Sequence, residues 1–431
     1  MRLFYLTTEF LWPPHQGGRV RSLAQLKLLA AQPEVTALTI FSLTEVAVTP
    51  AEIEALSQAV LGARPAQLPP LQLRVVPPPR HPIHLKQAPG ELLRVLGRRL
   101  RDGTPYLLGK WQSAAVTATL RGELQAGYDV VYIDHLGMAV YLPVLREALP
   151  HARLVLEEHN VESDFFRQFA ARPTLLPPLR PLARLEHRAA ARAEAHVLDE
   201  VDAVVTISGQ DALDLVALHR RLGRRDRAVH AVPVPQVMET SRPSRPPPPT
   251  GEPPRLCYVG SLSWHPNVLG LDWFCQKVWP HVQALRPDAR LTIAGSGLAA
   301  GPDGRPRVPV TWQVPGVDVV GYVPDLEALY QRALAAIAPV LGGSGVRIKL
   351  LESLRAGLPT VTTSAGAAGL PLTPGREVLI EDDPRRFAQA AARLLTDPPL
   401  REALRQGGYK FLEEHHSRAR ATEALRRALI L

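Results

Sequence analysis

Residues 338–363 have the sequence APVLGGSGVRIKLLESLRAGLPTVTT, which predicts a strand end, a glycine loop, a helix and a second strand. The loop at 341–345 contains three glycines, and glycine lacks the Cβ that would keep a backbone away from a ligand. The free amides at the start of the next helix, together with the helix dipole, favour an anion there. The loop, with Ser344 and Gly345 at its end, therefore predicts a phosphate site. It is not a Walker loop, because the Gly-Lys-Ser/Thr ending is absent.

Charged side chains follow this loop directly. Arg347 and Lys349 can neutralise a diphosphate. Glu352 lies on the same helix face as Lys349, and its carboxylate can accept hydrogen bonds from a pair of sugar hydroxyls. An ordinary turn followed by a surface ion pair would show the same spacing. The glycines, the two cations and the Ala-Gly-Leu-Pro stop at 356–359 favour a site for a nucleotide-diphospho compound.

The amino-terminal half alternates apolar, strand-like segments with helical ones. Strands are expected at 3–8, 36–43, 71–76, 130–134, 154–158 and 203–208, and an amphipathic helix is expected at 20–31. This alternation favours a parallel sheet that helices cover on both faces.

A proline-rich break at 236–254 divides the chain. It contains seven prolines, four of them consecutive, which favours an extended linker. Beyond it, strands are expected at 255–259, 291–294, 317–320, 335–339 and 360–363, and helices at 269–285, 326–333 and from 384 onward. The predicted fold is α/β, with two Rossmann-like doubly wound domains facing each other across a cleft. Its expected parts are an amino-terminal domain at 1–235, the linker at 236–254, a donor domain at 255–415 and a helix at 416–431 that packs back on the first domain.

Composition excludes several classes of protein. The net charge is +9, but only six of the 50 basic residues are lysine, and arginine is spread along the whole chain. No zinc-finger spacing or aromatic-rich RNA motif accompanies the charge, so we expect no nucleic-acid partner. The two cysteines, Cys257 and Cys275, predict neither a disulfide framework nor a metal site.

The sequence predicts a cytoplasmic protein. No window of about 18 apolar residues predicts a spanning helix, and the scarce cysteines fit a reducing compartment. The basic amphipathic segment at 91–101 would suit contact with an anionic membrane, and equally a helix packed on the sheet. Peripheral contact with the inner face of the membrane therefore stays open.

A second glycine loop precedes the helix at 20–31. Gly17 and Gly18 are placed to bring backbone amides toward a ligand from the amino-terminal domain. Arg19 and Arg21 fall in the first turn of the helix, where cations are disfavoured unless an anion lies nearby. A plain turn with solvated arginines is the alternative.

Polar side chains follow two neighbouring strands of the first domain. His135 follows the strand at 130–134, at the end where ligands of parallel sheets collect. It can hydrogen-bond a sugar hydroxyl or a reacting group, although a lone histidine also serves structural roles. The next strand leads into His159, Asn160 and Glu162, which we take as acceptor-side candidates.

Two turns of the second domain carry further donor-side candidates. Gly260 follows the first strand and permits close approach of a ligand, and Asn267 either caps the next helix or contacts that ligand. Tyr322 and Val323 follow the strand at 317–320 and can present backbone groups to a base.

These motifs together resemble the retaining glycosyltransferases of family 4, in particular the branch associated with exopolysaccharide and cell-envelope sugars. The resemblance rests on the paired glycines at 17–18 and on the runs 259–261, 321–323 and 339–370. It implies a GT-B fold, a ribose contact by Glu352, a diphosphate contact by the amino-terminal glycine loop and a sugar contact by His135.

The chain departs from the family pattern at two points. A glutamate usual in the family falls at Ser344, and an arginine and a lysine usual after the first strand of the second domain fall at Ser261 and Asn267. Arg347 and Lys349 offer replacement cations.

The resemblance implies transfer of a sugar from a nucleotide-diphospho-sugar to a hydroxyl of a glycan, a lipid-linked sugar or a small molecule. We expect retention of configuration at the anomeric carbon. We expect no metal, and no cofactor beyond the nucleotide-sugar co-substrate. Two alternatives stay open: a sugar-nucleotide epimerase, and a non-catalytic GT-B-like nucleotide-binding subunit.

Overall fold

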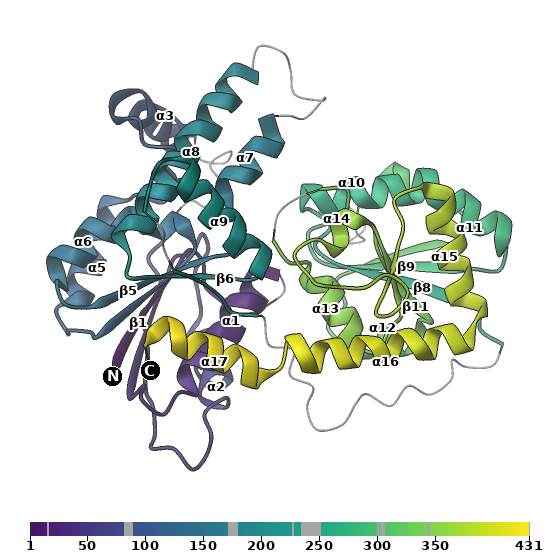
Figure 1. The fold of residues 1–431 in the computed structure, drawn as a ribbon, viewed down its shortest axis with the longest axis horizontal. Coiled ribbons are helices and arrows are strands. Elements are labelled where there is room, and N and C mark those ends of the chain that lie inside the picture. Colours follow the sequence, from purple (N-terminus) through teal and green to yellow (C-terminus); the bar gives the residue numbers. More distant parts are fainter. Residues whose placement is uncertain are drawn as a thin grey trace. The chain divides into compact units, whose positions relative to one another are not determined.

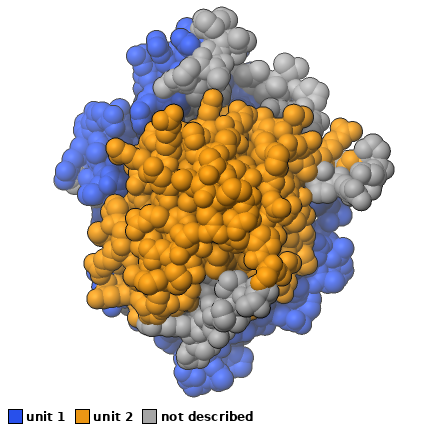
Figure 2. Space-filling model, turned by 90° about the vertical axis from the view of Figure 1, so that its right-hand side faces the viewer, with its two compact units in different colours: residues 1–234, 419–431 blue, residues 235–418 orange. Residues whose placement is uncertain are grey.

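The structure, a computed structural model, describes residues 1–14, 17–81, 89–170, 180–225, 228–233, 251–299, 301, 307–342 and 345–430. It divides into two compact units, Met1–Val234 with Ala419–Leu431, and Pro235–Arg418, which Figure 2 shows in different colours. We call them unit 1 and unit 2. Most of the predicted linker, 236–250, lies outside the described residues, as does the site candidate Ser344.

Unit 1 is built on a seven-stranded sheet in the order β3-β2-β1-β4-β5-β6-β7. All paired strands are parallel. The strands are β1 Arg2–Thr7, β2 Ala37–Ser42, β3 Gln72–Val75, β4 Val130–Asp134, β5 Arg153–Glu158, β6 Ala203–Thr206 and β7 Val229–Ala231. The helices are α1 Gly17–Ala30, α2 Pro50–Leu61, α3 Pro89–Asp102, α4 Tyr106–Gly109, α5 Ala114–Leu124, the 3₁₀ turn η2 Leu136–Tyr141, α6 Leu142–Ala148, α7 Glu162–Ala170, α8 Arg180–Glu200, α9 Gly209–Arg221 and α17 Arg418–Leu429 (Figure 1).

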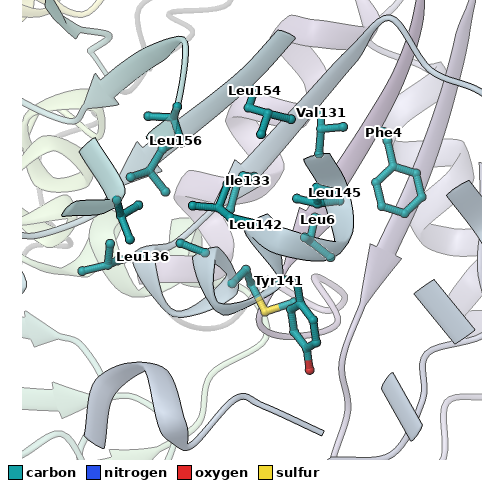
Figure 3. Packing of buried hydrophobic residues seen from close by; sticks show 14 of the residues in the cluster. Phe4, Leu6, Val131, Ile133, Leu136, Tyr141, Leu142, Leu145, Leu154 and Leu156 are labelled. Carbon is teal, nitrogen blue, oxygen red and sulfur yellow. The ribbon is translucent and has the colours of Figure 1, made fainter. Parts of the chain in front are cut away.

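The core of unit 1 lies on both faces of this sheet, because successive side chains of a strand point to opposite faces. In β1, Phe4 and Leu6 join one hydrophobic cluster, while Leu3 and Tyr5 join the other. Figure 3 shows the first cluster, in which the strand residues pack with side chains of η2 and α6 such as Leu145. Strands buried on both faces explain why the sequence shows continuous apolar runs here.

Unit 2 repeats the plan with a six-stranded parallel sheet in the order β10-β9-β8-β11-β12-β13. Its strands are β8 Arg255–Val259, β9 Arg290–Ala294, β10 Val317–Gly321, β11 Ala335–Ala338, β12 Thr360–Thr362 and β13 Leu379–Ile380. Its helices are α10 His265–Trp273, the π-helical η4 Phe274–Val278, α11 Trp279–Leu285, the 3₁₀ turn η5 Val310–Trp312, α12 Leu326–Arg332, α13 Ile348–Arg355, α14 Ser364–Ala367, α15 Pro384–Thr396 and α16 Pro398–His415. Both units therefore have the doubly wound fold that the sequence predicts.

Three details differ from the sequence-based expectation. The short edge strands β7 and β13 carry too few residues to stand out as patterns. The helix expected at 269–285 is divided by the π-helical η4. Pro280 follows that turn, and since proline has no amide proton, the regular hydrogen-bond ladder is interrupted there.

The carboxyl-terminal helix α17 packs on unit 1, although it follows unit 2 in the chain. Its apolar face, which includes Ala421 and Leu425, joins the same cluster as Leu3. Arg426 pairs with Glu34 at 2.6 Å. Within the described residues, no helix is both long and apolar enough to span a membrane.

Candidate functional site

The donor-side candidates of unit 2 lie beside the topological switch point of its sheet. The chain enters the sheet at β8, adds β9 and β10 on one side, and then crosses to β11 on the other side. In doubly wound sheets, ligands bind outside the carboxyl ends of the strands at such a point. The loops that leave β8 and β11 there carry Gly260 and the glycine loop at 341–345.

Lys349 is the centre of the cluster at this point. It lies in the first turn of α13, and its Nζ donates to Asn267 Oδ1 at 2.6 Å and to the hydroxyl of Tyr258 at 2.9 Å. The amide of the Asn267 side chain donates in turn to Ser261 O at 2.8 Å. Asn267 therefore does not cap α10, which begins two residues earlier behind Trp264. It instead fixes the position of the lysine ammonium.

Burial gives this ammonium unusual electrostatics. Burial lowers the pKa of Lys349 to about 7, with a further lowering by Arg347 and an opposing effect of Glu352. Burial also raises the pKa of Glu352, against the effects of Arg355 and Lys349. Lys349 and Glu352 are both half-buried, and a ligand with a diphosphate and a pair of hydroxyls would offer each of them a partner.

Arg347 directly precedes α13, at its N-cap position, and its guanidinium donates to Gly342 O at 3.4 Å. Gly345 has φ +77°, a left-handed conformation that favours glycine. Thr362 of β12 donates to Ala338 O at 2.8 Å and so holds the start of the loop. One loop and one helix therefore bring together Gly345, Arg347, Lys349 and Glu352.

Two glycines near this cluster are closely packed. A Cβ on Gly270 would lie 1.7 Å from Pro339 O, so α10 packs directly on the segment that leaves β11. A Cβ on Gly260 would lie 2.9 Å from the Tyr258 hydroxyl.

Tyr322 and Val323 follow β10, the far edge strand of the sheet, and Tyr322 is 52% exposed.

The candidates of unit 1 gather at the equivalent switch point, between β1 and β4. Asp134 ends β4 with a fully buried carboxylate, which accepts from Thr7 Oγ1 at 2.7 Å and lies 2.7 Å from His159 Nε2. His135 stacks on His159 with ring centroids 3.7 Å apart, and its Nδ1 lies 3.4 Å from the same carboxylate. His159 is thus buried beneath His135, whose side chain keeps 23% exposure.

The two stacked imidazoles titrate differently. Burial disfavours the charged form of both, but Asp134 outweighs burial at His135 and raises its pKa to about 9. Burial and the neighbouring His135 lower the pKa of His159. His135 also has φ +79°, a strained conformation that persists mainly where function requires it. The raised pKa favours the protonated form of the outer imidazole, in which both ring nitrogens are hydrogen-bond donors.

Asp134, His135 and His159 each offer one possible metal-ligand atom. These three atoms lie within 4.8 Å of one another, a spacing that a metal ion could use. A protonated imidazole has no free lone pair for a metal. A metal ion bound there would have to displace the proton that Asp134 favours on His135.

The helix α1 begins at Gly17, earlier than expected, so Gly17 and Gly18 lie in its first turn with the free amides of a helix start. The arginines that follow find protein carboxylates. Arg19 pairs with Glu9 at 2.6 Å, and Arg21 is buried with Glu157, also at 2.6 Å. The alternative of solvated arginines is therefore wrong for Arg21, and the anion beside it is a protein carboxylate.

The remaining acceptor-side candidates stand at the start of α7. The Asn160 side chain hydrogen-bonds the Glu162 carboxyl, and burial raises the pKa of Glu162 against the effects of His135 and Lys110. The amide of Glu162 donates to Glu194 Oε1 at 2.7 Å. Glu162 and His135 thus interact across the same end of the sheet.

Sequence reasoning missed Tyr258 and Asp134. Both sit inside or at the end of buried strands, and a polar group there needs a partner. A tyrosine in the buried strand β8 and a carboxylate as the last residue of β4 were the available signals.

Comparison with known proteins finds a family match within unit 2. Residues 253–397 match the family Glycosyl transferases group 1. Arg347, Lys349 and Glu352 lie in this matched segment.

Two curated relatives match parts of the chain. An uncharacterised 44.6 kDa protein of the cps region of Klebsiella pneumoniae is 26% identical over 37% of this chain and 42% of its own length. A GDP-mannose-dependent monoacylated alpha-(1-6)-phosphatidylinositol monomannoside mannosyltransferase of Corynebacterium glutamicum is 29% identical over 33% of this chain and 39% of its own length. The chain thus matches about two fifths of each relative.

Among solved structures, HepE of Anabaena in complex with UDP is similar over 100% of both chains, with a TM-score of 0.62 and 12% identity. Together with the two parallel sheets, this similarity confirms the predicted GT-B fold with two Rossmann-like domains.

Proposed function

We propose that this protein is a retaining glycosyltransferase that moves a sugar from a nucleotide-diphospho-sugar to a hydroxyl acceptor without a divalent cation. The observation that carries the proposal is the Lys349–Asn267–Tyr258 cluster, which lies with Arg347 and Glu352 in the segment that matches group 1 glycosyltransferases. HepE, which shares the fold, has been solved with UDP and with UDP-glucose.

In the proposed reaction, the bond between the sugar's anomeric carbon and the phosphate oxygen breaks, and its electron pair passes to the diphosphate. Arg347, Lys349 and the amides at the start of α13 stabilise this charge, the kind of preorganised electrostatic effect that dominates many enzymes. The acceptor oxygen bonds to the anomeric carbon on the same face, and its proton passes to the leaving phosphate. Glu352 holds the ribose.

In unit 1, the charged His135 donates to a hydroxyl of the transferred sugar. A group with a pKa of about 9 is a donor at neutral pH and a poor base. Asp134 and His159 hold its ring in place. Asn160 and Glu162 are the acceptor-side candidates that unit 1 still offers, because His159 is buried beneath His135. The free amides of Gly17 and Gly18 can bind an anion. The name of the Corynebacterium glutamicum relative gives a phosphatidylinositol monomannoside as its acceptor. This favours a glycan or lipid-linked acceptor here, which would suit a cytoplasmic protein at the inner face of the membrane.

The experiment that tests the proposal is a donor panel. The full chain is incubated with UDP-, GDP- and ADP-sugars and glycan acceptors in EDTA, and products are followed by NMR. We expect transfer with an unchanged anomeric configuration, at a rate within about twofold of that with Mg²⁺, because Arg347 and Lys349 supply the positive charge. Epimer formation without acceptor would contradict transferase function, as would failure to bind any nucleotide.

The donor affinity should fall as pH rises above 7. In the protein without ligand, Lys349 has a pKa of about 7. A bound diphosphate favours the charged form of this lysine, so donor binding above pH 7 takes up a proton. This linkage weakens affinity by up to about tenfold per pH unit until the pKa of the bound state is reached. Calorimetry with UDP from pH 6 to pH 9 measures the slope. A Lys349→Met variant should lose this dependence, and an unchanged slope in that variant would contradict the assignment.

A further inference from the structure

A second candidate site lies within unit 1, away from the two sheet ends described above. A cavity of about 460 Å³ opens between the end of α3, the start of α4 and the exposed face of α8. Four arginines line it, Arg99, Arg188, Arg192 and Arg224, together with His196. Figure 1 shows α3 beside α8 in this part of unit 1.

The carboxylates around this cavity neutralise only part of its charge. Arg99 pairs with Glu186 at 3.0 Å, and Arg224 pairs with Asp199. Arg188 and Arg192 have no ion pair within the part of the chain that the structure describes. The cavity therefore holds two guanidinium groups that no described carboxylate neutralises.

The sequence of α8 places these like charges next to one another on the helix, which destabilises the helix. Arginine recurs at every fourth position, at 184, 188 and 192. Like charges four residues apart face each other on a helix and destabilise it. An anion in the cavity would relieve this repulsion.

Exposed leucines accompany these arginines along the same helices. Leu185 lines the cavity and is 53% exposed, Leu182 lies one turn earlier on α8 and is 62% exposed, and Leu100 follows Arg99 on α3 and is 88% exposed. A free inorganic anion gives no reason for three exposed leucines. Arginines mixed with exposed leucines are typical of surfaces that lie in a membrane interface.

We propose that this cavity binds the phosphate of an anionic lipid headgroup, while Leu100, Leu182 and Leu185 contact the apolar part of the bilayer. Arg188 and Arg192 form charge-assisted hydrogen bonds to the phosphate, for which the planar guanidinium is suited. The site is separate from the sugar-transfer residues, so it stands whether or not the proposed transferase function is correct.

The test is sedimentation of the full chain with vesicles of phosphatidylcholine, with or without phosphatidylglycerol. We expect binding only to the anionic vesicles. The Arg188→Gln/Arg192→Gln variant should bind about twenty-fivefold more weakly, since each basic residue near an anionic surface contributes about a factor of five. A Leu182→Ser/Leu185→Ser variant should also bind more weakly, although its charge is unchanged.

The matched control is Arg385→Gln/Arg386→Gln, a pair of exposed arginines on α15 of unit 2, which should bind vesicles like the parent protein. Melting curves check that each variant is folded. Equal vesicle binding by the Arg188/Arg192 variant and the parent would overturn the proposal. Calorimetric binding of pyrophosphate that the Arg188/Arg192 variant loses, without any vesicle binding by the parent protein, would overturn it too, because the ligand of the cavity would then be a free phosphate.

Discussion

Lys349→Met should lower kcat/KM for the nucleotide-sugar by about 10²–10³-fold, while the fold persists. The variant keeps most of the aliphatic volume of the side chain but loses the cation that Asn267 and Tyr258 hold in place. Removing one preorganised group that stabilises transition-state charge typically costs this factor in turnover. Burial already disfavours the charged lysine, so the folded state loses little with its removal. Steady-state kinetics with the preferred donor measures the effect.

The matched control is Lys277→Met, an exposed lysine in η4 of the same unit, which should leave turnover unchanged. Arg347→Gln should resemble Lys349→Met, because both cations serve the leaving diphosphate. Near-normal turnover by both the Lys349 and Arg347 variants would overturn the phosphate assignment and leave only the fold.

Arg21→Met should destabilise unit 1 by about 3–5 kcal/mol, since it leaves a buried charge without its partner. The side chains of Arg21 and Glu157 are 1% and 0% exposed, and their ion pair is 2.6 Å long. Tyr132 donates to the other carboxylate oxygen of Glu157 at 2.8 Å, which does not replace a cation. Calorimetric melting of the full chain should show a lower transition for unit 1.

A neighbouring ion pair of the same length supplies the control. Arg19 and Glu9 are 26% and 23% exposed, and pairs that water reaches are worth at most about 1 kcal/mol. Arg19→Met should therefore shift the transition far less than Arg21→Met. The Arg21→Met/Glu157→Gln double variant should recover most of the loss. Equal shifts for Arg19→Met and Arg21→Met would show that burial does not set the cost here.

The alternation of apolar runs predicted both sheets because strands buried on both faces need apolar residues throughout. It predicted β1, β4, β5, β8 and β11 within a residue or two. The edge strand β7, with three residues, and β13, with two, escaped because so short a segment shows no periodicity. The π-helical turn η4 was not predicted, because residue propensities carry no information about a local change of hydrogen-bond partner.

Part of the candidate site could likewise be predicted from the sequence, and part could not. The glycine loop, Arg347, Lys349 and Glu352 are close in sequence, so helix geometry alone predicted that they act together. Tyr258 is 91 residues from Lys349, and the bond between them exists only because β8 and α13 meet at the switch point. No local pattern contains that information.

The opening segment at 338–363 thus determined, by itself, a glycine loop, two cations close to it, and a carboxylate on the same helix face as Lys349. The tertiary structure decided which partners those groups have. It placed Asn267 and Tyr258 against Lys349 and half-buried the ammonium, and this burial lowers its pKa to about 7. Sequence fixes spacing along one element, whereas burial and charge at a site depend on side chains from elements far apart in the chain.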